Sequence, residues 1–370
     1  MLFDKRLLKN LDFILLIVVL GMTALGVVFV YGATKSSPLA AGDPLSFFKR
    51  QLLSAILGVF LMLVAISSDY QVFQRMSGIL YWGNIGMLGL VLLIGRSVSG
   101  AQAWIRLGPL SFQPSEFSKL LAIMTLANHL AEKEDIQSLG GLISPLVHVA
   151  VPMGLILLQN DLGTALVFLA VLLGMLYAAG ARVRDLLILV GSGAIASPLV
   201  YFFCLKDYQR ARLLIFINPY RDPLGEGYNV IQSTIAIGSG RFFGKGLFHG
   251  TQGQLNFLPA HHTDFIFSVV GEELGFIGAA IILLGFLFII SRSLAAAAQA
   301  KDDYGRLICS GVASMLLFHV MVNVGMTMSI MPVTGIPLPF MSYGGSSLMA
   351  NLAAIGLVLS IHMRRQRILF

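Results

Sequence analysis

The residues best suited to chemistry lie in "LPAHHTDFIFSVVGEELG", residues 258–275, at the start of a long apolar run. On an ideal helix that begins at Asp264, four small residues lie within about 40° of the aspartate. These are Ser268, Gly271, Gly275 and Gly278. Such a stripe favours close helix packing, and here its end carries a carboxylate that could remove a proton from a hydroxyl group. The alternative is that Asp264 only caps the helix, although Thr263 could cap it equally well.

A second group of charges opens the fourth apolar segment, "QPSEFSKLL". Glu116 and Lys119 are three residues apart and therefore share one helix face. Charges within an apolar segment usually face the interior of a helix bundle and are functional. Two compatible interpretations stay open: a mutual ion pair that fixes the helix orientation, or a pair in which Glu116 sets the charge and position of a functional Lys119. Glu272, two turns beyond Asp264, is expected to pair with a cation inside the bundle.

Three familiar kinds of site do not fit the sequence. "GSGRFFGKG" has Ser239 and Gly246 where a phosphate-binding Walker loop needs glycine and Ser or Thr. The adjacent histidines of "HHTD" lack the i,i+4 spacing of helical zinc ligands. Cys204 and Cys309 are far apart in apolar runs, so they indicate neither a disulfide framework nor a zinc site. A hard cation such as Mg or Mn, held by Asp264 or Asp161 with waters, fits these side chains better than zinc does.

The composition places these residues in a membrane protein. Of 370 residues, 56% are hydrophobic and 12% are charged, with a mean hydropathy of +0.83, whereas soluble proteins have roughly a quarter charged residues. Ten apolar segments are centred near residues 22, 60, 86, 123, 150, 171, 194, 278, 318 and 354. They must be helical, because lipid offers no partner for free backbone groups. The chain is therefore predicted to be a single all-α domain, residues 1–370, with about ten transmembrane helices.

The basic residues predict the orientation. With both termini in the cytoplasm, most lysines and arginines fall on the inner side, as is typical of membrane proteins, and the net charge of +7 needs no nucleic-acid partner. The apolar run from about Ile14 to Val30, preceded by Lys5, Arg6 and Lys9, is then a retained first span. The Gly- and Pro-rich third, fifth, seventh and ninth loops all face outward. The seventh loop, about residues 205–263, is expected to contain short helices along the membrane surface, because basic and apolar residues are interspersed in "YQRARLLIFINP".

An outer surface with carboxylates and cations suits a lipid that carries an anionic head group. Arg50 and Arg106 are predicted at the same level as Asp161 and Lys119. A carboxylate could take a proton from a hydroxyl group while the cations stabilise a departing phosphate. The same residues would also suit a transporter of such a lipid, so these patterns leave both functions open.

Four segments are specific enough to identify a family. "GAQAWIRLGPLSFQPSEFSKL", "DLGTA", "AIGSGRFFGKGLFHGTQGQLNFLPAHHTDFIFSVVGEELG" and "PVTGIPLPFMSYGGSS" resemble the SEDS family of bacterial cell-wall membrane proteins. The resemblance extends from Arg50 to the C-terminus. "GTQGQLNFLP" with "GKG" is more similar to the elongation branch, RodA, than to the division branch, FtsW, and a sporulation member stays an alternative.

The resemblance implies a peptidoglycan glycosyltransferase of the bacterial cytoplasmic membrane with an outward-facing active site. Such enzymes polymerise lipid II, and Asp264 would deprotonate the acceptor 4-hydroxyl group, which then expels undecaprenyl pyrophosphate from the donor. A class B penicillin-binding protein and other elongation-complex membrane proteins would be the partners. The catalytic candidates are Asp264, Lys119 and Glu116. The substrate-binding candidates are Arg50, Arg106, Gln113, Ser115, Asp161, Arg210, His262, Thr263, Glu272, Ser342 and Tyr343.

The sequence departs from the family pattern at four positions. Ala260 stands where many members have glutamate, Arg241 and Ser329 each replace a glycine, and Asn160 replaces a proline. None of these changes affects Asp264. The first argues against a mechanism that needs a second carboxylate beside it.

Two other functions compete with the enzyme. A lipid II flippase should need polar residues through the full membrane depth, whereas the predicted cytoplasmic halves carry few, chiefly Asn128, His129 and His319. The inverted repeats of many transporters are not evident either. A non-catalytic scaffold for the transpeptidase would not need the inward Glu116 and Lys119.

Overall fold

The computed structural model describes residues 9–35, 43, 45–98, 100–107, 110–133, 135–225, 227–255 and 257–365. Side chains at positions 98, 106, 107, 110, 200 and 204 are not part of this description. Ten long helices occupy the ten predicted apolar segments. They are α2 (Phe13–Thr34), α3 (Ser46–Ser67), α5 (Ser77–Ile94), α6 (Pro114–Ala131), α7 (Leu139–Leu158), α8 (Leu162–Ala178), α9 (Val183–Leu199), α13 (Ile266–Ala298), α14 (Asp303–Thr327) and α15 (Gly345–Met363).

The helices confirm a polytopic all-α membrane fold. Eight helices in the described ranges are long and apolar enough to cross a bilayer. α8 has only 17 residues, and α6 is not among the eight. α6 carries Glu116 and Lys119, whose side chains are buried against other helices. The count of ten spans and the cytoplasmic location of both termini stay predictions, and Lys5 and Arg6, on which the orientation partly rests, lie outside the described residues.

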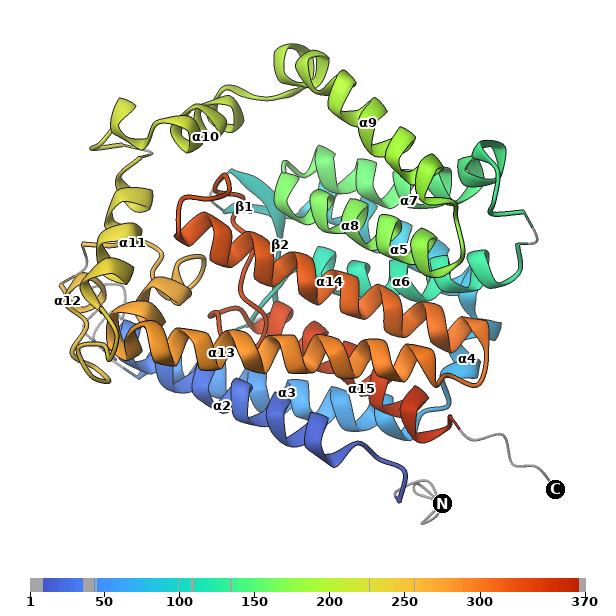
Figure 1. The fold of residues 1–370 in the computed structure, drawn as a ribbon, viewed down its shortest axis with the longest axis horizontal. Helices are drawn as coiled ribbons and strands as arrows, with labels where there is room; N and C mark the ends of the chain where they lie inside the picture. Colours follow the sequence, from blue (N-terminus) through green and yellow to red (C-terminus); the bar gives the residue numbers. More distant parts are fainter. Residues whose placement is uncertain are drawn as a thin grey trace.

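α14 and α15 form the centre of the bundle, and α9 lies at its edge. In their most apolar windows, 72% of α14 and 89% of α15 residues are buried, but none of α9. Figure 1 shows α9 and α10 arching along one side of the molecule, with α13, α14 and α15 running side by side. α3 packs closely on α15 at Gly356, which has no side chain. A Cβ atom at this position would lie 2.6 Å from the carbonyl oxygen of Met62. Small residues allow this close approach, as is common in membrane helix pairs.

α13 is broken at Gly275, which adopts φ 66° and ψ −164°. Its 33 residues would extend about 50 Å as one straight helix, well beyond the roughly 30 Å of a bilayer core. Segment 241–246 supplies the hydrogen bonds that the break removes. The Lys245 and Gly246 amides donate to the carbonyls of Glu272 and Glu273, both at 3.0 Å. The amides of residues 276 and 277 donate in turn to the carbonyls of residues 241 and 242.

This break corrects the prediction of one continuous stripe from Asp264 to Gly278. The helix begins at Ile266 and changes direction at Gly275. Gly271 instead faces α11, where a Cβ atom at Gly240 would lie 1.9 Å from the Gly271 carbonyl oxygen. Gly240 and Gly244 of "GSGRFFGKG" therefore allow close backbone contact with α13, and the segment does not form a phosphate loop.

The segments between the long helices contain more structure than a helix count suggests. The predicted short helices of the long seventh loop are confirmed as α10 (Asp207–Ile217), η3 (Pro219–Arg221), α11 (Tyr228–Ser239) and α12 (Thr251–Gln254). α4 (Tyr70–Arg75) and η2 (Val200–Cys204) are further short helices. A small antiparallel sheet was not predicted; its strands are β1 (Arg96–Val98), β2 (Ala101–Leu107) and β3 (Leu110–Phe112). Gln102 fastens it to the bundle by donating from its backbone to Gln159 and from its side chain to Leu92 and Gly95.

Candidate functional site

A cavity of about 510 Å³ lies where the third, fifth, seventh and ninth loops meet. The third loop contributes Ala101, Trp104, Ser111 and Gln113, and the fifth contributes residues 160–163. The seventh contributes Tyr208, Gln209, Arg212, Leu213, Ala260 and residues 262–264, and the ninth contributes residues 332–335, Pro337 and residues 343–347. Four segments that are far apart in the sequence thus converge on one site. The predicted site residues that line it are Arg50, Gln113, Asp161, His262, Thr263, Asp264 and Tyr343.

Asp264 lies in the turn that precedes α13. The helix N-cap is Phe265, without a side-chain cap, so the interpretation of Asp264 as a helix cap is wrong. Its carboxylate lies on the cavity beside Gly335, with Oδ2 3.6 Å from the position that a Cβ atom of that glycine would take. Burial raises the pKa of Asp264 to about 6, while the Arg212 guanidinium and the Thr263 hydroxyl oppose the rise. A carboxylate with this pKa is mostly ionised at neutral pH and still basic enough to accept a proton.

The backbone of this turn is held by two side chains and one backbone amide, from α14 and from the ninth loop. The Asn323 side chain of α14 donates to the Asp264 carbonyl at 2.9 Å. The Ser342 hydroxyl donates to the Thr263 carbonyl at 2.7 Å, and the Tyr343 amide donates to the His262 carbonyl at 2.8 Å. Ser342 therefore acts on the turn from behind the cavity surface. Asn323 was not among the candidates, although an asparagine inside a long apolar segment was the available signal.

His262 forms an aromatic wall of the cavity. Its ring lies 5.2 Å from the Phe47 ring and 5.7 Å from the Tyr343 ring, centroid to centroid. Burial, assisted by neighbouring His261, lowers the pKa of His262 to about 4. His262 is therefore neutral when Asp264 is ionised, and it offers the site a polar ring without a charge.

The cations of the site differ from those predicted. Arg50 lines the cavity, and the side chain of Arg106 lies outside the described residues. Arg210 does not line the cavity, because its guanidinium donates to the carbonyls of Tyr201 and Phe202 at 2.9 and 2.8 Å. Arg212 lines it instead. Residues two apart on a helix point about 200° away from each other, so "YQRAR" could present only one of its arginines to the site.

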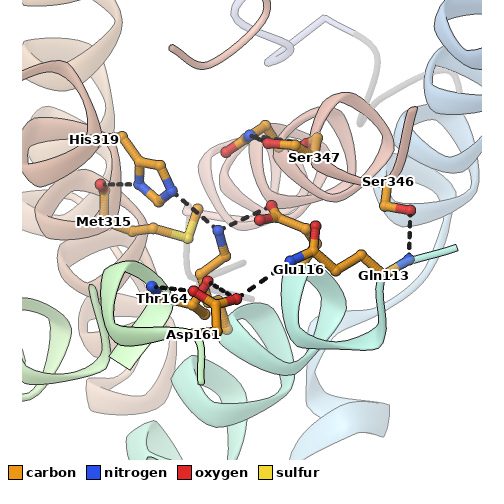
Figure 2. A network of polar contacts seen from close by, with 10 residues as sticks. Gln113, Glu116, Asp161, Thr164, Met315, His319, Ser346 and Ser347 are labelled. Carbon is orange, nitrogen blue, oxygen red and sulfur yellow. Dashed lines mark hydrogen bonds and ion pairs between the residues drawn. The ribbon is translucent and has the colours of Figure 1, made fainter. Parts of the chain in front are cut away.

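Behind the main cavity lies a buried polar network, drawn in Figure 2. Lys119 Nζ donates to Glu116 Oε2 at 2.9 Å, which confirms the predicted ion pair. The same nitrogen lies 3.0 Å from His319 Nε2, and His319 Nδ1 lies 2.7 Å from the Met315 carbonyl oxygen. Glu116, Lys119 and His319 line a small cavity of about 40 Å³. Gln113, Asp161, Gly335 and Pro337 line both cavities, so the network borders the main site.

Asp161 connects the two cavities and caps α8. Its carboxylate accepts from the Thr164 amide at 3.0 Å, the Thr164 hydroxyl at 2.8 Å and the Gln113 side chain at 3.3 Å. Burial raises the pKa of Asp161 against these hydrogen bonds. The backbone N–H of Gln113 in turn donates to the Ser346 hydroxyl oxygen at 2.9 Å. Ser115 is buried and lines neither cavity.

Glu272 also lies away from both cavities. Its fully buried carboxylate pairs with Lys245 Nζ at 2.7 Å and accepts from Thr251 through its amide at 2.8 Å and its hydroxyl at 2.9 Å. The expected pairing with a cation is thereby confirmed, and Lys245 belongs to the segment that repairs the α13 break. Glu272 accordingly stabilises the fold around that break.

The described carboxylates of the site are not grouped as ligands of a metal ion would be. Within the described ranges, no group of three or more His, Cys, Asp or Glu side chains could hold one. Asp161 and Asp264 line the same cavity, but the Asp161 carboxylate already accepts three hydrogen bonds.

Comparisons with known proteins agree with the motifs. Residues 12–367 match the family model FtsW/RodA/SpoVE, described as "Cell cycle protein". A probable peptidoglycan glycosyltransferase FtsW of Trichlorobacter lovleyi is 41% identical over 362 residues, covering 96% of this chain and 93% of that protein. The peptidoglycan glycosyltransferase MrdB of Escherichia coli K12 is 39% identical over 327 residues, covering 88% of each.

Solved structures agree as well. A chain from a peptidoglycan synthase complex that coordinates polymerization and crosslinking has a TM-score of 0.81 at 38% identity, covering 96% of this chain and 98% of that one. The rod shape determining protein RodA of Thermus thermophilus has a TM-score of 0.72 at 33% identity, with the same coverage of 96% and 98%.

Proposed function

The chain belongs to the FtsW, RodA and SpoVE family of cell cycle proteins, and we propose that it polymerises lipid II into glycan strands at the outer face of the cytoplasmic membrane. It is a multi-pass protein of that membrane and a peptidoglycan glycosyltransferase. The observation that carries the proposal is the position of Asp264. Its carboxylate borders a cavity that also receives the Arg50 and Arg212 side chains.

Asp264 would be the general base. Its carboxylate accepts the proton of the 4-hydroxyl group on the acceptor sugar, and the resulting nucleophilic oxygen attacks the anomeric carbon of the donor. A new glycosidic C–O bond forms as the bond to undecaprenyl pyrophosphate breaks, and the electron pair leaves with the pyrophosphate. Since the pKa of Asp264 is about 6, the base form predominates at neutral pH.

Arg50, Arg212 and Lys119 would act on the leaving group. Guanidinium groups bind phosphate oxygens through two parallel hydrogen bonds, and fixed cations stabilise charge that develops in the transition state. The first two line the main cavity, and the third borders it from behind, held by Glu116. The cavity volume of about 510 Å³ is within the roughly 300–1,000 Å³ of ligand sites, which suits part of a disaccharide head group.

The decisive experiment measures polymerisation of purified lipid II by the purified protein together with its cognate class B penicillin-binding protein, whose transpeptidase is blocked. Asp264→Asn keeps the shape of the side chain and removes its charge. Asp303→Asn is the matched control, because Asp303 is exposed in the first turn of α14 and lines neither cavity. We expect glycan strands from the wild type and the control only.

Each other outcome rejects part of the proposal. Equal product from wild type and Asp264→Asn would remove Asp264 from the chemistry. If neither folded protein gave product, while the wild type moved lipid II across vesicle membranes, the flippase would replace the enzyme. If neither activity were present and the partner's transpeptidase still depended on the chain, the scaffold function would be favoured.

A class B penicillin-binding protein is the partner that the structural similarity supports, because the chain with a TM-score of 0.81 comes from a peptidoglycan synthase complex. We further propose a role in cell elongation, supported by the RodA-like "GTQGQLNFLP" segment. Relatives named FtsW and MrdB are 41% and 39% identical, so overall identity does not separate the two roles. Depletion of the protein in its host tests this: loss of rod shape supports elongation, and filaments without septa would assign the chain to division.

A further inference from the structure

His319 is a fully buried histidine with no role in the reaction described above. It lies on α14, where Figure 2 labels it, and its Nε2 contacts Nζ of Lys119 on α6. The sequence marked it only as a polar residue in an otherwise apolar segment. A buried polar side chain at this depth is costly unless it makes specific hydrogen bonds, so its contacts indicate what it does.

The two contacts of the ring fix its protonation. Nδ1 lies 2.7 Å from the Met315 carbonyl oxygen, which can only accept, so Nδ1 carries the hydrogen. Nε2 lies 3.0 Å from Lys119 Nζ, and an ammonium group can only donate. Nε2 must therefore be the unprotonated acceptor. The geometry specifies a neutral ring in one tautomer, in the way that a second hydrogen bond often sets the role of a histidine nitrogen.

Lys119 is thereby held from two helices. An ammonium group has three N–H donors; one binds Glu116 on its own helix, at 2.9 Å, and one binds His319 on α14. The third has no side-chain or backbone acceptor in the part of the chain that the structure describes. With two donors fixed, the tetrahedral geometry of the nitrogen fixes the direction of the third.

The small cavity provides a destination for that third donor. Its volume of about 40 Å³ exceeds the roughly 10–15 Å³ that one water needs. Lys119, Glu116 and His319 all line it, and it shares four lining residues with the main cavity. An oxygen atom there, from a water or from the anionic head group, would receive the hydrogen bond.

We propose that His319 is a positioning residue for the glycosyl transfer: it accepts one N–H of Lys119 and so directs the remaining N–H toward the cavity that adjoins the substrate site. This inference rests on the proposed function. His319 acts through Lys119 and contacts no reacting atom. Glu116 alone would leave the ammonium free to rotate about its single contact, so the charge would be present but not directed.

The test compares His319→Leu with His319→Gln, using initial rates over a range of lipid II concentrations. Leucine fills the space without an acceptor, whereas the glutamine side-chain oxygen can take the place of Nε2. We expect His319→Leu to lower kcat by about 10- to 100-fold, the range in which misdirected catalytic groups fall. KM should change less than threefold, and His319→Gln should recover most of the rate.

His148→Leu is the matched control. His148 is a partly buried histidine on a membrane helix, where it contacts Thr125 at 3.1 Å and stacks on Tyr81, and it lines neither cavity. It should keep wild-type kinetics. Thermal unfolding of all three variants in detergent, within a few degrees of the wild type, separates positioning from a loss of fold.

A double variant isolates the route of action. If His319 works through Lys119, His319→Leu should have no further effect on the rate in a Lys119→Met background, because coupled groups are not additive. Equal rates for His319→Leu and wild type, or an undiminished effect in the Lys119→Met background, would overturn the inference. An inactive wild type would instead mean that the proposed function has failed, so the two failures are distinguishable.

Discussion

The raised pKa of Asp264 predicts a specific dependence of polymerisation on pH. Burial raises the pKa of this carboxyl from its ordinary value of 3.8 to about 6. The base form must be present for the acceptor hydroxyl to be activated, so the rate follows the ionised fraction. That fraction rises with pH through the folded-state pKa and levels off above it.

The expected magnitude follows from the titration curve. With a pKa of about 6, about 91% of Asp264 is ionised at pH 7 and about 9% at pH 5, so kcat should fall roughly tenfold between them. An unperturbed aspartate with a pKa of 3.8 would be more than about 90% ionised at both pH 5 and pH 7, so the rate would hardly change. The two cases differ by far more than the error of a rate measurement.

The assay measures initial rates of lipid II polymerisation between pH 4.5 and 8.5, with substrate above KM. Arg212→Gln removes the cation that holds the pKa of Asp264 down, so its acid limb should move to higher pH. Arg210→Gln is the matched control, because the Arg210 guanidinium donates to Tyr201 and Phe202 and does not line the cavity. Its acid limb should stay in place.

Asp161 must be tested alongside, since burial raises the pKa of this cavity carboxyl as well. Asp161→Asn can lower the rate without moving the acid limb, provided that the limb belongs to Asp264. His262, with a pKa of about 4, stays neutral over most of the range. A flat profile from pH 5 to 7, or an acid limb that Arg212→Gln leaves in place or moves to lower pH, would refute the reasoning.

Three further predictions concern stability, measured by thermal unfolding in detergent. Because a buried carboxyl with a raised pKa favours its neutral form, Asp264→Asn should stabilise the fold by up to about 3 kcal/mol above pH 6, and this gain should vanish as the pH falls below about 4. Lys245→Met leaves the Glu272 carboxylate buried without its cation and should cost about 3 kcal/mol; an unchanged transition would contradict this. Gly240→Ala puts a Cβ atom 1.9 Å from a carbonyl oxygen and should cost about 1–3 kcal/mol. Gly238→Ala, which meets no atom within 4 Å, should be neutral or stabilising.

The sequence predicted the membrane fold well because hydropathy is a local property. Each long apolar segment reports its own burial in lipid, whatever its neighbours do. The small sheet was missed for the same reason: β2, "AQAWIRL", has only seven residues, and its place depends on the contacts of Gln102 with two helices. The break at Gly275 was missed because it requires segment 241–246, more than 25 residues earlier in the sequence, to satisfy the open backbone groups.

The same distinction between local and tertiary information decides which residues of the site could be predicted from the sequence. The Glu116 and Lys119 pair was predictable because three residues separate them on one helix. His319, the third member of the network, comes from α14, 200 residues away, and no spacing rule connects it to Lys119. Arg210 and Arg212 show the limit within one helix: composition indicates a basic face on α10, but only its packing decides which arginine reaches the cavity.

The departure at Ala260 explains why the turn works without a second carboxylate. Ala260 has a φ of 53°, a left-handed conformation that is uncommon for residues other than glycine. Its carbonyl accepts from the amides of Thr263 and Phe265 at 3.1 and 3.3 Å and from the Thr263 hydroxyl at 3.2 Å. Position 260 therefore contributes its backbone carbonyl oxygen, and the hydrogen bonds to this oxygen stabilise the turn that contains Asp264. Any residue that tolerates this φ can supply that oxygen, so a glutamate side chain here is not required for Asp264 to reach the cavity.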